Sequence, residues 1–362
     1  MDIAFYGSSL LSSYWNGAAT YYRGLLGALA QLGHGISFYE PDAFDRQSHR
    51  DIEPPGWARV VVYPATVAGV AAVLAEAARA DVVIKASGVG VFDDELLAGV
   101  LRHAQPGAIR AFMDVDAPAT LAAIHADPGD PMRNALAELD LVLTYGGGPP
   151  VVDAYLALGA RQCVPIYNAL DPATHHPVAA VPSFEADLAF LANRLPDREA
   201  RVDAFFLDAA ARCPGQAFLL GGNGWHDKPM PDNVRAIGHV GTAEHNALNC
   251  SSLAVLNVAR DSMAAVGYSP ATRVFEAAGA GACLITDAWE GIELFLQPGA
   301  EVLVARDGID VADHLRSLTP ARARAIGNAA RTRVLAGHTY QQRAVILDQV
   351  LQDTMARKRQ AA

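Results

Sequence analysis

The feature that most constrains the fold is an alternation of short apolar segments with helical segments, which occurs twice along the chain. In the first part we expect strands at 2–7, 36–40, 59–63, 81–86, 109–114, 141–145 and 162–167. Helices are expected around Tyr21 to Leu29 and at 67–79, 93–104, 117–125, 131–138 and 150–158. Strands that alternate with helices in this way assemble into a parallel, doubly wound sheet.

A second alternation follows a proline-rich break. Because proline recurs between 168 and 187 and no helical period persists there, we place an interdomain linker at 171–187. Further strands are expected at 188–193, 217–221, 234–237, 253–257, 282–286 and 301–305, and helices at 197–211, 243–249, 270–280, 309–317 and 319–335. The sequence predicts an α/β protein whose two Rossmann-like domains, 1–170 and 188–339, face each other across a cleft. A C-terminal helix at 340–358 is expected to cross back onto the first domain.

Composition narrows the class of ligand. Hydrophobic residues make up 51% of the 362 residues and charged residues 19%, which argues against disorder. The net charge of −11, with a basic run only at 357–359, argues against nucleic-acid and anionic-membrane partners. No apolar run reaches the roughly 20 residues of a membrane span, and residues 1–7 lack the features of a secretion signal. We therefore expect a cytoplasmic protein.

The sequence gives no sign of a metal site. Its four cysteines are far apart, without paired spacing, so we interpret them as buried small hydrophobic residues. His175 and His176 are adjacent, but no third ligand has a suitable spacing.

The stretch from Ser269 to Phe295 is the strongest candidate for a ligand site. Ser269 and Pro270 suit the start of a helix, and the apolar segment at 282–286 suits a buried parallel strand. Residues 287–292 then lie at the carboxyl end of that strand, where open α/β sheets bind ligands and helix N-termini attract anions.

Charged residues in the second domain fit a nucleoside diphosphate. Glu276 lies in an apolar context, where a carboxylate needs a partner; a ribose diol or an ion pair with Arg273 would supply one. Arg194 and Arg198 follow a strand and suit a diphosphate, because a guanidinium matches phosphate oxygens. The alternative for Arg194 is a local pair with Asp197 or Glu199.

Other candidates lie at further strand ends. Gly222, Asn223 and Gly224 would let the backbone approach a nucleotide or would simply form a turn, and His239 would border the base or be satisfied structurally. In the first domain, Asp114 is our candidate for a cleft-facing base and Asp116 for a helix cap, while Asn16 and Gly17 would bring backbone near the sugar phosphate.

Several segments resemble a known family. The segment GYSPATRVFEAAGAGACLITDAWEGIELFLQPGAEVLVA resembles the C-terminal domain of CgeB-like (spore-maturation-protein type) glycosyltransferases and, more distantly, the large retaining GT-B families. NALDP with HHP resembles their interdomain hinge, ANRLPDRE their phosphate-binding segment, and NGAATYYRGLLGALAQLGH their N-terminal loop and helix. The resemblance covers most of the chain and implies a GT-B fold with a nucleotide-sugar donor held mainly by the C-terminal domain.

The resemblance also assigns roles. It implies that Glu276 binds the ribose hydroxyls and Arg194 the diphosphate, and that the donor sugar and phosphate contact Glu290, Gly291, Ile292 and Glu293. The chain departs from the pattern at Tyr268, where the retaining families usually have a second glutamate. Glu290 or Glu293 would have to substitute for it.

These observations predict metal-independent, retaining transfer of a sugar to a hydroxyl-bearing acceptor, with no cofactor and with a UDP-sugar as the first choice of donor. If configuration is retained, the leaving phosphate takes the acceptor proton; if it is inverted, Asp114 is the candidate base. A sugar-nucleotide epimerase or hydrolase and a non-catalytic nucleotide-sugar sensor are the alternatives. An NAD-dependent oxidoreductase is disfavoured because GSSLLSS, and not G-x-G-x-x-G, follows the first strand.

Overall fold

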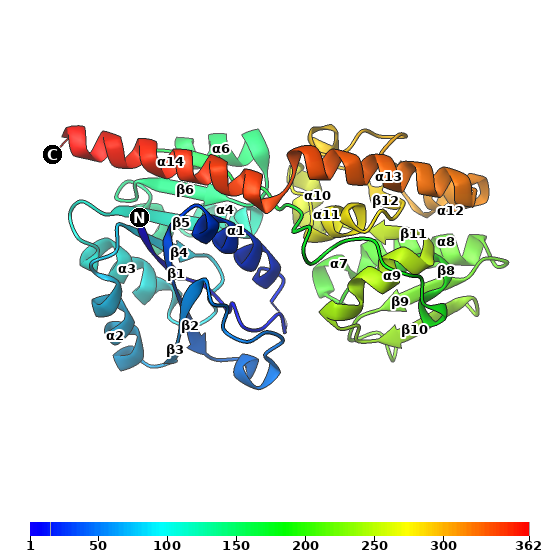
Figure 1. The fold of residues 1–362 in the computed structure, drawn as a ribbon, viewed down its shortest axis with the longest axis horizontal. Coiled ribbons are helices and arrows are strands. Elements are labelled where there is room, and N and C mark those ends of the chain that lie inside the picture. The colour runs from blue at the N-terminus through cyan, green and yellow to red at the C-terminus, as the bar shows by residue number, and fades with distance from the viewer. Residues whose placement is uncertain (15, 362) are drawn as a thin grey trace. The chain divides into compact units, whose positions relative to one another are not determined.

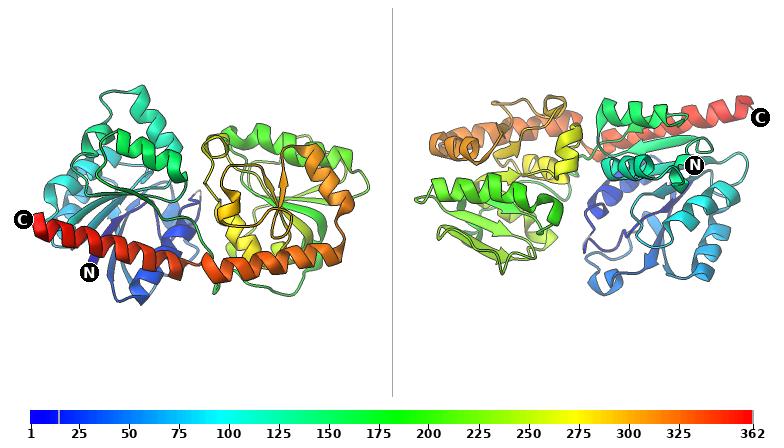
Figure 2. Two further views of the ribbon diagram at one scale, coloured as in Figure 1. Left: turned by 90° about the horizontal axis from the view of Figure 1, so that it is seen from above. Right: turned by 180° about the vertical axis from the view of Figure 1, so that it is seen from behind.

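The computed structural model describes residues 1–14 and 16–361, which form two compact units (Figure 1). Unit 1 comprises Met1–Asn168 and Tyr340–Ala362, and unit 2 comprises Ala169–Thr339. Each unit has its own parallel sheet. In the views of Figure 2, helices cover both faces of the sheet within each unit.

The sheet of unit 1 has seven strands in the order β3-β2-β1-β4-β5-β6-β7. The strands are β1 (Asp2–Tyr6), β2 (Gly35–Asp42), β3 (Ala58–Pro64), β4 (Val82–Ala86), β5 (Ile109–Asp114), β6 (Leu141–Thr144) and β7 (Cys163–Pro165). The helices are α1 (Ala19–Gln31), the short η1 (Arg46–His49), α2 (Val67–Ala77), α3 (Asp93–His103), α4 (Ala117–Ala126), α5 (Pro131–Ala135), α6 (Gly148–Ala157) and α14 (Tyr340–Ala361).

Alternating side chains of β1 build the core on both faces of this sheet. The Phe5 ring contacts Phe38 of β2 and Tyr22 of α1, at centroid distances of 5.4 and 5.1 Å. The next residue, Tyr6, points to the opposite face and stacks on Tyr39 at 5.0 Å. Successive strand residues face opposite sides, so a strand buried on both faces is apolar on both, as β1 is from Ile3 to Tyr6.

The C-terminal helix α14 packs against α1 within unit 1 (Figure 1). The ring of Tyr340 lies against the backbone of Gly24, where an added Cβ would come within 2.1 Å of Tyr340 Cδ2. A glycine at this position therefore allows the two helices to approach closely.

The sheet of unit 2 has six strands in the order β10-β9-β8-β11-β12-β13. The strands are β8 (Ala186–Leu191), β9 (Phe218–Gly221), β10 (Val234–Gly238), β11 (Ser252–Asn257), β12 (Leu284–Asp287) and β13 (Leu303–Ala305). The helices are η2 (Pro182–Phe184), α7 (Pro196–Val202), the π-helical turn η3 (Asp203–Leu207), α8 (Asp208–Arg212), η4 (Thr242–Glu244), α9 (His245–Ser251), α10 (Asp261–Val266), α11 (Thr272–Gly279), η5 (Ile292–Leu294), α12 (Gly308–Ser317) and α13 (Pro320–Gly337).

The predicted class, α/β with two Rossmann-like doubly wound sheets, is confirmed. One local prediction was wrong, and one helix was missed. Ser269 does not cap a helix, because α11 begins at Thr272 after Ala271 and the Ser269 hydroxyl donates to the carbonyl of Gly267 instead. The helix expected at 197–211 is present as the consecutive α7, η3 and α8, with a π-helical turn in its middle. The helix α10 was not predicted.

The cysteines follow the prediction in the main. Cys163, Cys213 and Cys283 are buried, Cys250 is partly exposed, and all four carry free thiols. Among the described residues, no helix is both long and apolar enough to cross a membrane.

Candidate active site

The buried carboxylate of Glu276 is the centre of the candidate site in unit 2. It lies on α11, and the residue is 8% exposed. Its Oε1 lies 3.9 Å from Nε2 of His175. Burial raises the pKa of Glu276, but the nearby His175, His245 and Arg273 outweigh it and hold the pKa below its ordinary value. The carboxylate therefore stays charged and is able to accept hydrogen bonds from a ligand.

Two partly buried arginines lie near each other, and one of them, Arg273, is close to this carboxylate. Burial, and the charge of Arg273, lower the pKa of Arg198 to about 10, so its guanidinium is still charged at neutral pH. Arg198 Nη2 donates to the carbonyl of Asn193 at 2.9 Å, while its buried Nε has no hydrogen-bond partner among the described residues. Burial also lowers the pKa of Arg273, and Glu276 partly offsets this. Two neighbouring cations with an unused donor favour an anion that carries more than one charge.

Arg194 lies in a network of local ion pairs. Its side chain, 26% exposed, pairs with Glu199 at 2.7 Å and with Asp227 at 2.8 Å, and it donates to the carbonyl of Gly224. The ion pair with Glu199 is the alternative that the sequence left open. The donors of Arg194 are thus engaged within the protein, whereas a donor of Arg198 is not.

The glycine-rich segment after β9 packs against the loop after β8. At Gly222, φ is +117°, and an added Cβ would lie 2.0 Å from the carbonyl oxygen of Ala192. Asn223 donates its amide to the side chain of Asn193, and an added Cβ at Gly224 would lie 3.1 Å from Cβ of Arg194. The glycines therefore serve a close approach of two loops, which is the turn that the sequence also allowed.

His239 and His245 lie at the end of β10 and just beyond it. His239 follows β10 directly and is exposed. His245 begins α9, is partly buried and bonds to the backbone of Val240. Burial lowers the pKa of His245, which favours the neutral imidazole.

The predicted sugar-contacting segment, 290–293, contains one short turn and not a full helix. Glu290 and Glu293 are exposed, whereas Gly291 and Ile292 are buried. Since η5 spans Ile292–Leu294 only, the predicted helix start is a single 3-10 turn, and a helix macrodipole contributes little here. Tyr268 donates a hydrogen bond to Glu290, so the residue that departs from the family pattern contacts a glutamate that could replace the missing one.

In unit 1, Asp114 is buried in a hydrogen-bonded turn. It is 0% exposed and accepts from the hydroxyls of Ser87 at 2.8 Å, Thr120 at 3.0 Å and Tyr155, and from the amide of Asp116 at 3.0 Å. Burial raises the pKa of Asp114, and these donors partly offset the shift. Its donors come from the start of α4, from Ser87 after β4 and from Tyr155 on α6, and this buried position differs from the exposed one that an acceptor base requires. Asp116 occupies the N-cap position of α4 without a side-chain capping bond.

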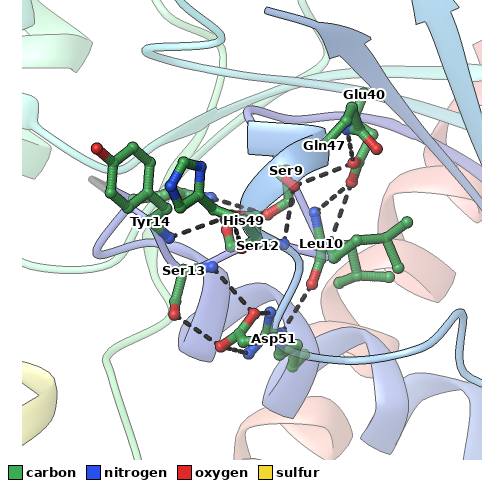
Figure 3. Close-up of polar contacts among 12 residues, drawn as sticks. Ser9, Leu10, Ser12, Ser13, Tyr14, Glu40, Gln47, His49 and Asp51 are labelled. Atoms are coloured by element: carbon green, nitrogen blue, oxygen red, sulfur yellow. Dashed lines mark hydrogen bonds and ion pairs between the residues drawn. The ribbon is translucent and has the colours of Figure 1, made fainter. Parts of the chain in front are cut away.

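The loop after β1, which holds Asn16 and Gly17, is fixed by buried polar contacts (Figure 3). Asn16 Nδ2 donates to the carbonyls of Ser9 and Ser12 at 2.9 and 3.0 Å, so its side chain stabilises the loop and does not face outward. Gly17 is exposed. Glu40 at the end of β2 accepts from the amide of Leu10 at 2.6 Å.

These contacts also bear on the NAD alternative. In dinucleotide-binding folds an acidic residue near the end of the second strand binds a ribose. The oxygens of Glu40 accept from Ser9, Leu10 and Gln47 instead, and the residue is fully buried.

Sequence reasoning missed one cluster. Ligand atoms of His175, His245 and Glu276 all lie within 4.8 Å of one another. The sequence showed no third ligand at a suitable spacing from His175, and in the structure its neighbours come from distant segments. No local spacing could have signalled them.

Comparisons with known proteins agree with this fold. Residues 198–349 match the family model described as "Glycosyl transferase-like". No curated protein matches the chain at a significant level of similarity.

Solved structures match over nearly the whole chain. A sucrose-phosphate synthase from Thermosynechococcus elongatus is 16% identical, with a TM-score of 0.73 over 98% of this chain and 99% of that chain. HepE from Anabaena, solved in complex with UDP-glucose, is 14% identical, with a TM-score of 0.67 over 98% and 100%. T4 phage BGT, solved with its UDP-glucose substrate, is 10% identical, with a TM-score of 0.61 over 98% and 99%.

The comparisons define the class of fold. The chain has the GT-B fold, and residues 198–349, which are most of unit 2 and the start of α14, match the glycosyl transferase-like family model.

Proposed function

We propose that the chain transfers a glycosyl group from a nucleoside-diphosphate sugar to a hydroxyl-bearing acceptor. The observation that carries the proposal is the position of the charged Glu276 near Arg273, which in turn lies near Arg198, all in unit 2. A buried carboxylate suits a ribose diol, and paired guanidinium groups suit a diphosphate. The UDP-glucose complexes of two similar structures support a UDP-sugar as the first donor to test.

In this proposal the two arginines stabilise the leaving group. The bond between the anomeric carbon and the diphosphate oxygen breaks through an oxocarbenium-like transition state, as in glycoside cleavage. Negative charge then develops on the diphosphate next to Arg198 and Arg273. By analogy with oxyanion-hole donors, each contributes about 3 kcal/mol. We propose that this neutralisation needs no metal.

We further propose that configuration is retained and that the leaving phosphate accepts the acceptor proton. The buried, fully hydrogen-bonded position of Asp114 supports this choice, because the inverting alternative used Asp114 as the base. The resemblance of residues 267–305 to the CgeB-like enzymes supports placing the chain in that subtype.

The test compares wild-type protein with Glu276→Ala, and with Glu185→Ala as a control that removes an exposed glutamate elsewhere in unit 2. Labelled UDP-sugars are incubated with and without an acceptor mixture, and UDP affinity is measured by calorimetry. We expect transfer by wild type and a Kd for UDP roughly 10- to 100-fold higher for Glu276→Ala, because a hydrogen bond to a charged group contributes about 1.5–3 kcal/mol.

Equal UDP affinity in all three proteins would contradict the assigned role of Glu276. Donor binding with no transfer to any acceptor would favour the sensor alternative, and a rearranged sugar with donor alone would favour the epimerase.

A further inference from the structure

We propose that His175, His245 and Glu276 form a binding site for a divalent transition-metal cation of the zinc type. One ligand atom from each lies within 4.8 Å of the other two. His175 precedes the sheet of unit 2, His245 begins α9 and Glu276 lies on α11, so the fold of unit 2 alone brings them together.

The spacing of these atoms suits a shared cation better than direct hydrogen bonding. Nε2 of His175 lies 3.9 Å from Oε1 of Glu276, which is too long for a hydrogen bond, and the two imidazole centroids are 6.4 Å apart. Ligands of tetrahedral zinc at about 2.0–2.1 Å from the metal are roughly 3.3 Å from one another. Side-chain movements of about 1 Å would therefore close the site around a cation.

One ring nitrogen of each imidazole already has a partner. Nδ1 of His175 lies 2.9 Å from Oγ1 of Thr174, which leaves Nε2 facing Glu276. His245 bonds to the backbone of Val240. Metal-binding histidines commonly use the second ring nitrogen in this way, because the outer contact fixes the tautomer and the ring orientation.

The ligand set indicates the class of cation. Two imidazoles and one carboxylate suit zinc and its neighbours, whereas magnesium and calcium prefer oxygen ligands alone. His245 is partly exposed, so solvent has access for a fourth ligand. The nearby Arg273 opposes a dication, so we expect weaker binding than in structural zinc sites.

A cation at this site would compete with the donor. This competition rests on the proposed function, in which the Glu276 carboxylate binds the ribose diol of the donor. A cation bound to Glu276 would occupy the same oxygens, and it would inhibit donor binding instead of assisting transfer.

The test is a titration of tag-free protein with Co²⁺, followed by the visible absorption of tetrahedral cobalt. His175→Gln and His245→Gln each remove one ligand. His176→Gln is the matched control, since it removes an exposed histidine next to His175. We expect a Kd for Co²⁺ at least about 10-fold higher in the first two variants, because even the loss of an outer contact costs 10- to 100-fold. The control should match wild type.

Absence of the cobalt spectrum in wild type, or equal affinity in all four proteins, would overturn the site. If thermal unfolding shows that His175→Gln or His245→Gln is not folded, X-ray absorption of zinc-loaded wild type replaces the comparison of variants. Two imidazole ligands around the zinc would support the site, and a coordination shell without imidazole would overturn it.

Uridine tests the competition, because it carries the ribose without the chelating phosphates. We expect uridine to raise the apparent Kd for Co²⁺ in wild type. Cobalt binding that is unaffected by saturating uridine would overturn the competition and the ribose assignment of Glu276, while leaving the cation site supported.

Discussion

The phenolic oxygen of Tyr268 donates a hydrogen bond to Oε1 of Glu290 at 2.9 Å. The backbone reinforces this contact, since the amide of Tyr268 donates to the carbonyl of Glu290 at 2.6 Å. Gly291 has φ +89°, and an added Cβ there would lie 2.2 Å from the Tyr268 ring. Tyr268 and Glu290 thus form one local unit, in which the tyrosine orients the glutamate.

This contact predicts different roles for the two glutamates of the segment. We expect Glu290→Gln to lower kcat by on the order of 100-fold, comparable with the loss of an oxyanion-hole donor. Tyr268→Phe should cost about 3- to 10-fold, because one solvent-exposed hydrogen bond contributes roughly 0.5–1.5 kcal/mol. Glu293→Gln, which removes the other exposed carboxylate, is the control in the same transfer assay. Equal kcat values for the two glutamine variants would refute the special role of Glu290.

The contrast between Arg198 and Arg194 gives a second prediction. Arg198→Ala should raise the Kd for UDP by roughly 10- to 100-fold, because it removes charge-assisted bonds worth about 1.5–3 kcal/mol. Uridine affinity should not change. Arg194→Ala should leave the Kd for UDP within about twofold, since its donors are used by Glu199 and Asp227. Calorimetry with both ligands checks this, and a larger effect of Arg194→Ala would reverse the assignment.

The residues of this site show what the sequence could and could not predict. The need of Glu276 for a partner followed from its apolar neighbours, and the structure supplies His175, His245 and Arg273. Arg273 is on the same helix and was predictable. The two histidines were not, because the loops that carry them meet only in the folded unit.

The arginines and the helix start show the same limit. Arg194 and Arg198 look equivalent in the sequence, but Glu199 and the loop after β9 together engage only Arg194. The start of α11 was misplaced because Gly267 and Tyr268 adopt positive φ values of 75° and 48°, a backbone conformation that the serine-proline pattern does not indicate.

The contact between α1 and α14 gives a prediction about stability. Gly24→Ala would place a Cβ 2.1 Å from the Tyr340 ring and push the helices apart. We expect it to lower the free energy of unfolding by about 1–3 kcal/mol, which is typical of overpacking. Urea denaturation measures this.

The double variant Gly24→Ala, Tyr340→Ala tests the cause. Because truncation of Tyr340 removes the clash, the double variant should lose less stability than the sum of the single variants. Strict additivity of the two losses would show that the clash is not their source.

The loop after β1 gives the last prediction. Glu40 is fully buried and accepts from the Ser9 hydroxyl at 3.0 Å, the Leu10 amide at 2.6 Å and the Gln47 side chain at 2.7 Å (Figure 3). Glu40→Ala would leave these donors without their acceptor. Each buried donor left unsatisfied costs about 1–3 kcal/mol, and water that enters the space recovers part of this. We therefore expect a loss of roughly 3 kcal/mol in the free energy of unfolding.

Two variants make this prediction specific. Gln47→Ala removes one of the donors and should cost about 1 kcal/mol, the usual contribution of one hydrogen bond or slightly more. Glu53→Ala removes an exposed glutamate of unit 1 and should stay within about 0.5 kcal/mol of wild type. Limited proteolysis of the same variants should cleave the 8–14 loop sooner in Glu40→Ala than in Glu53→Ala, because the buried carboxylate holds that loop against β2. Equal cleavage rates would mean that the backbone holds the loop without Glu40.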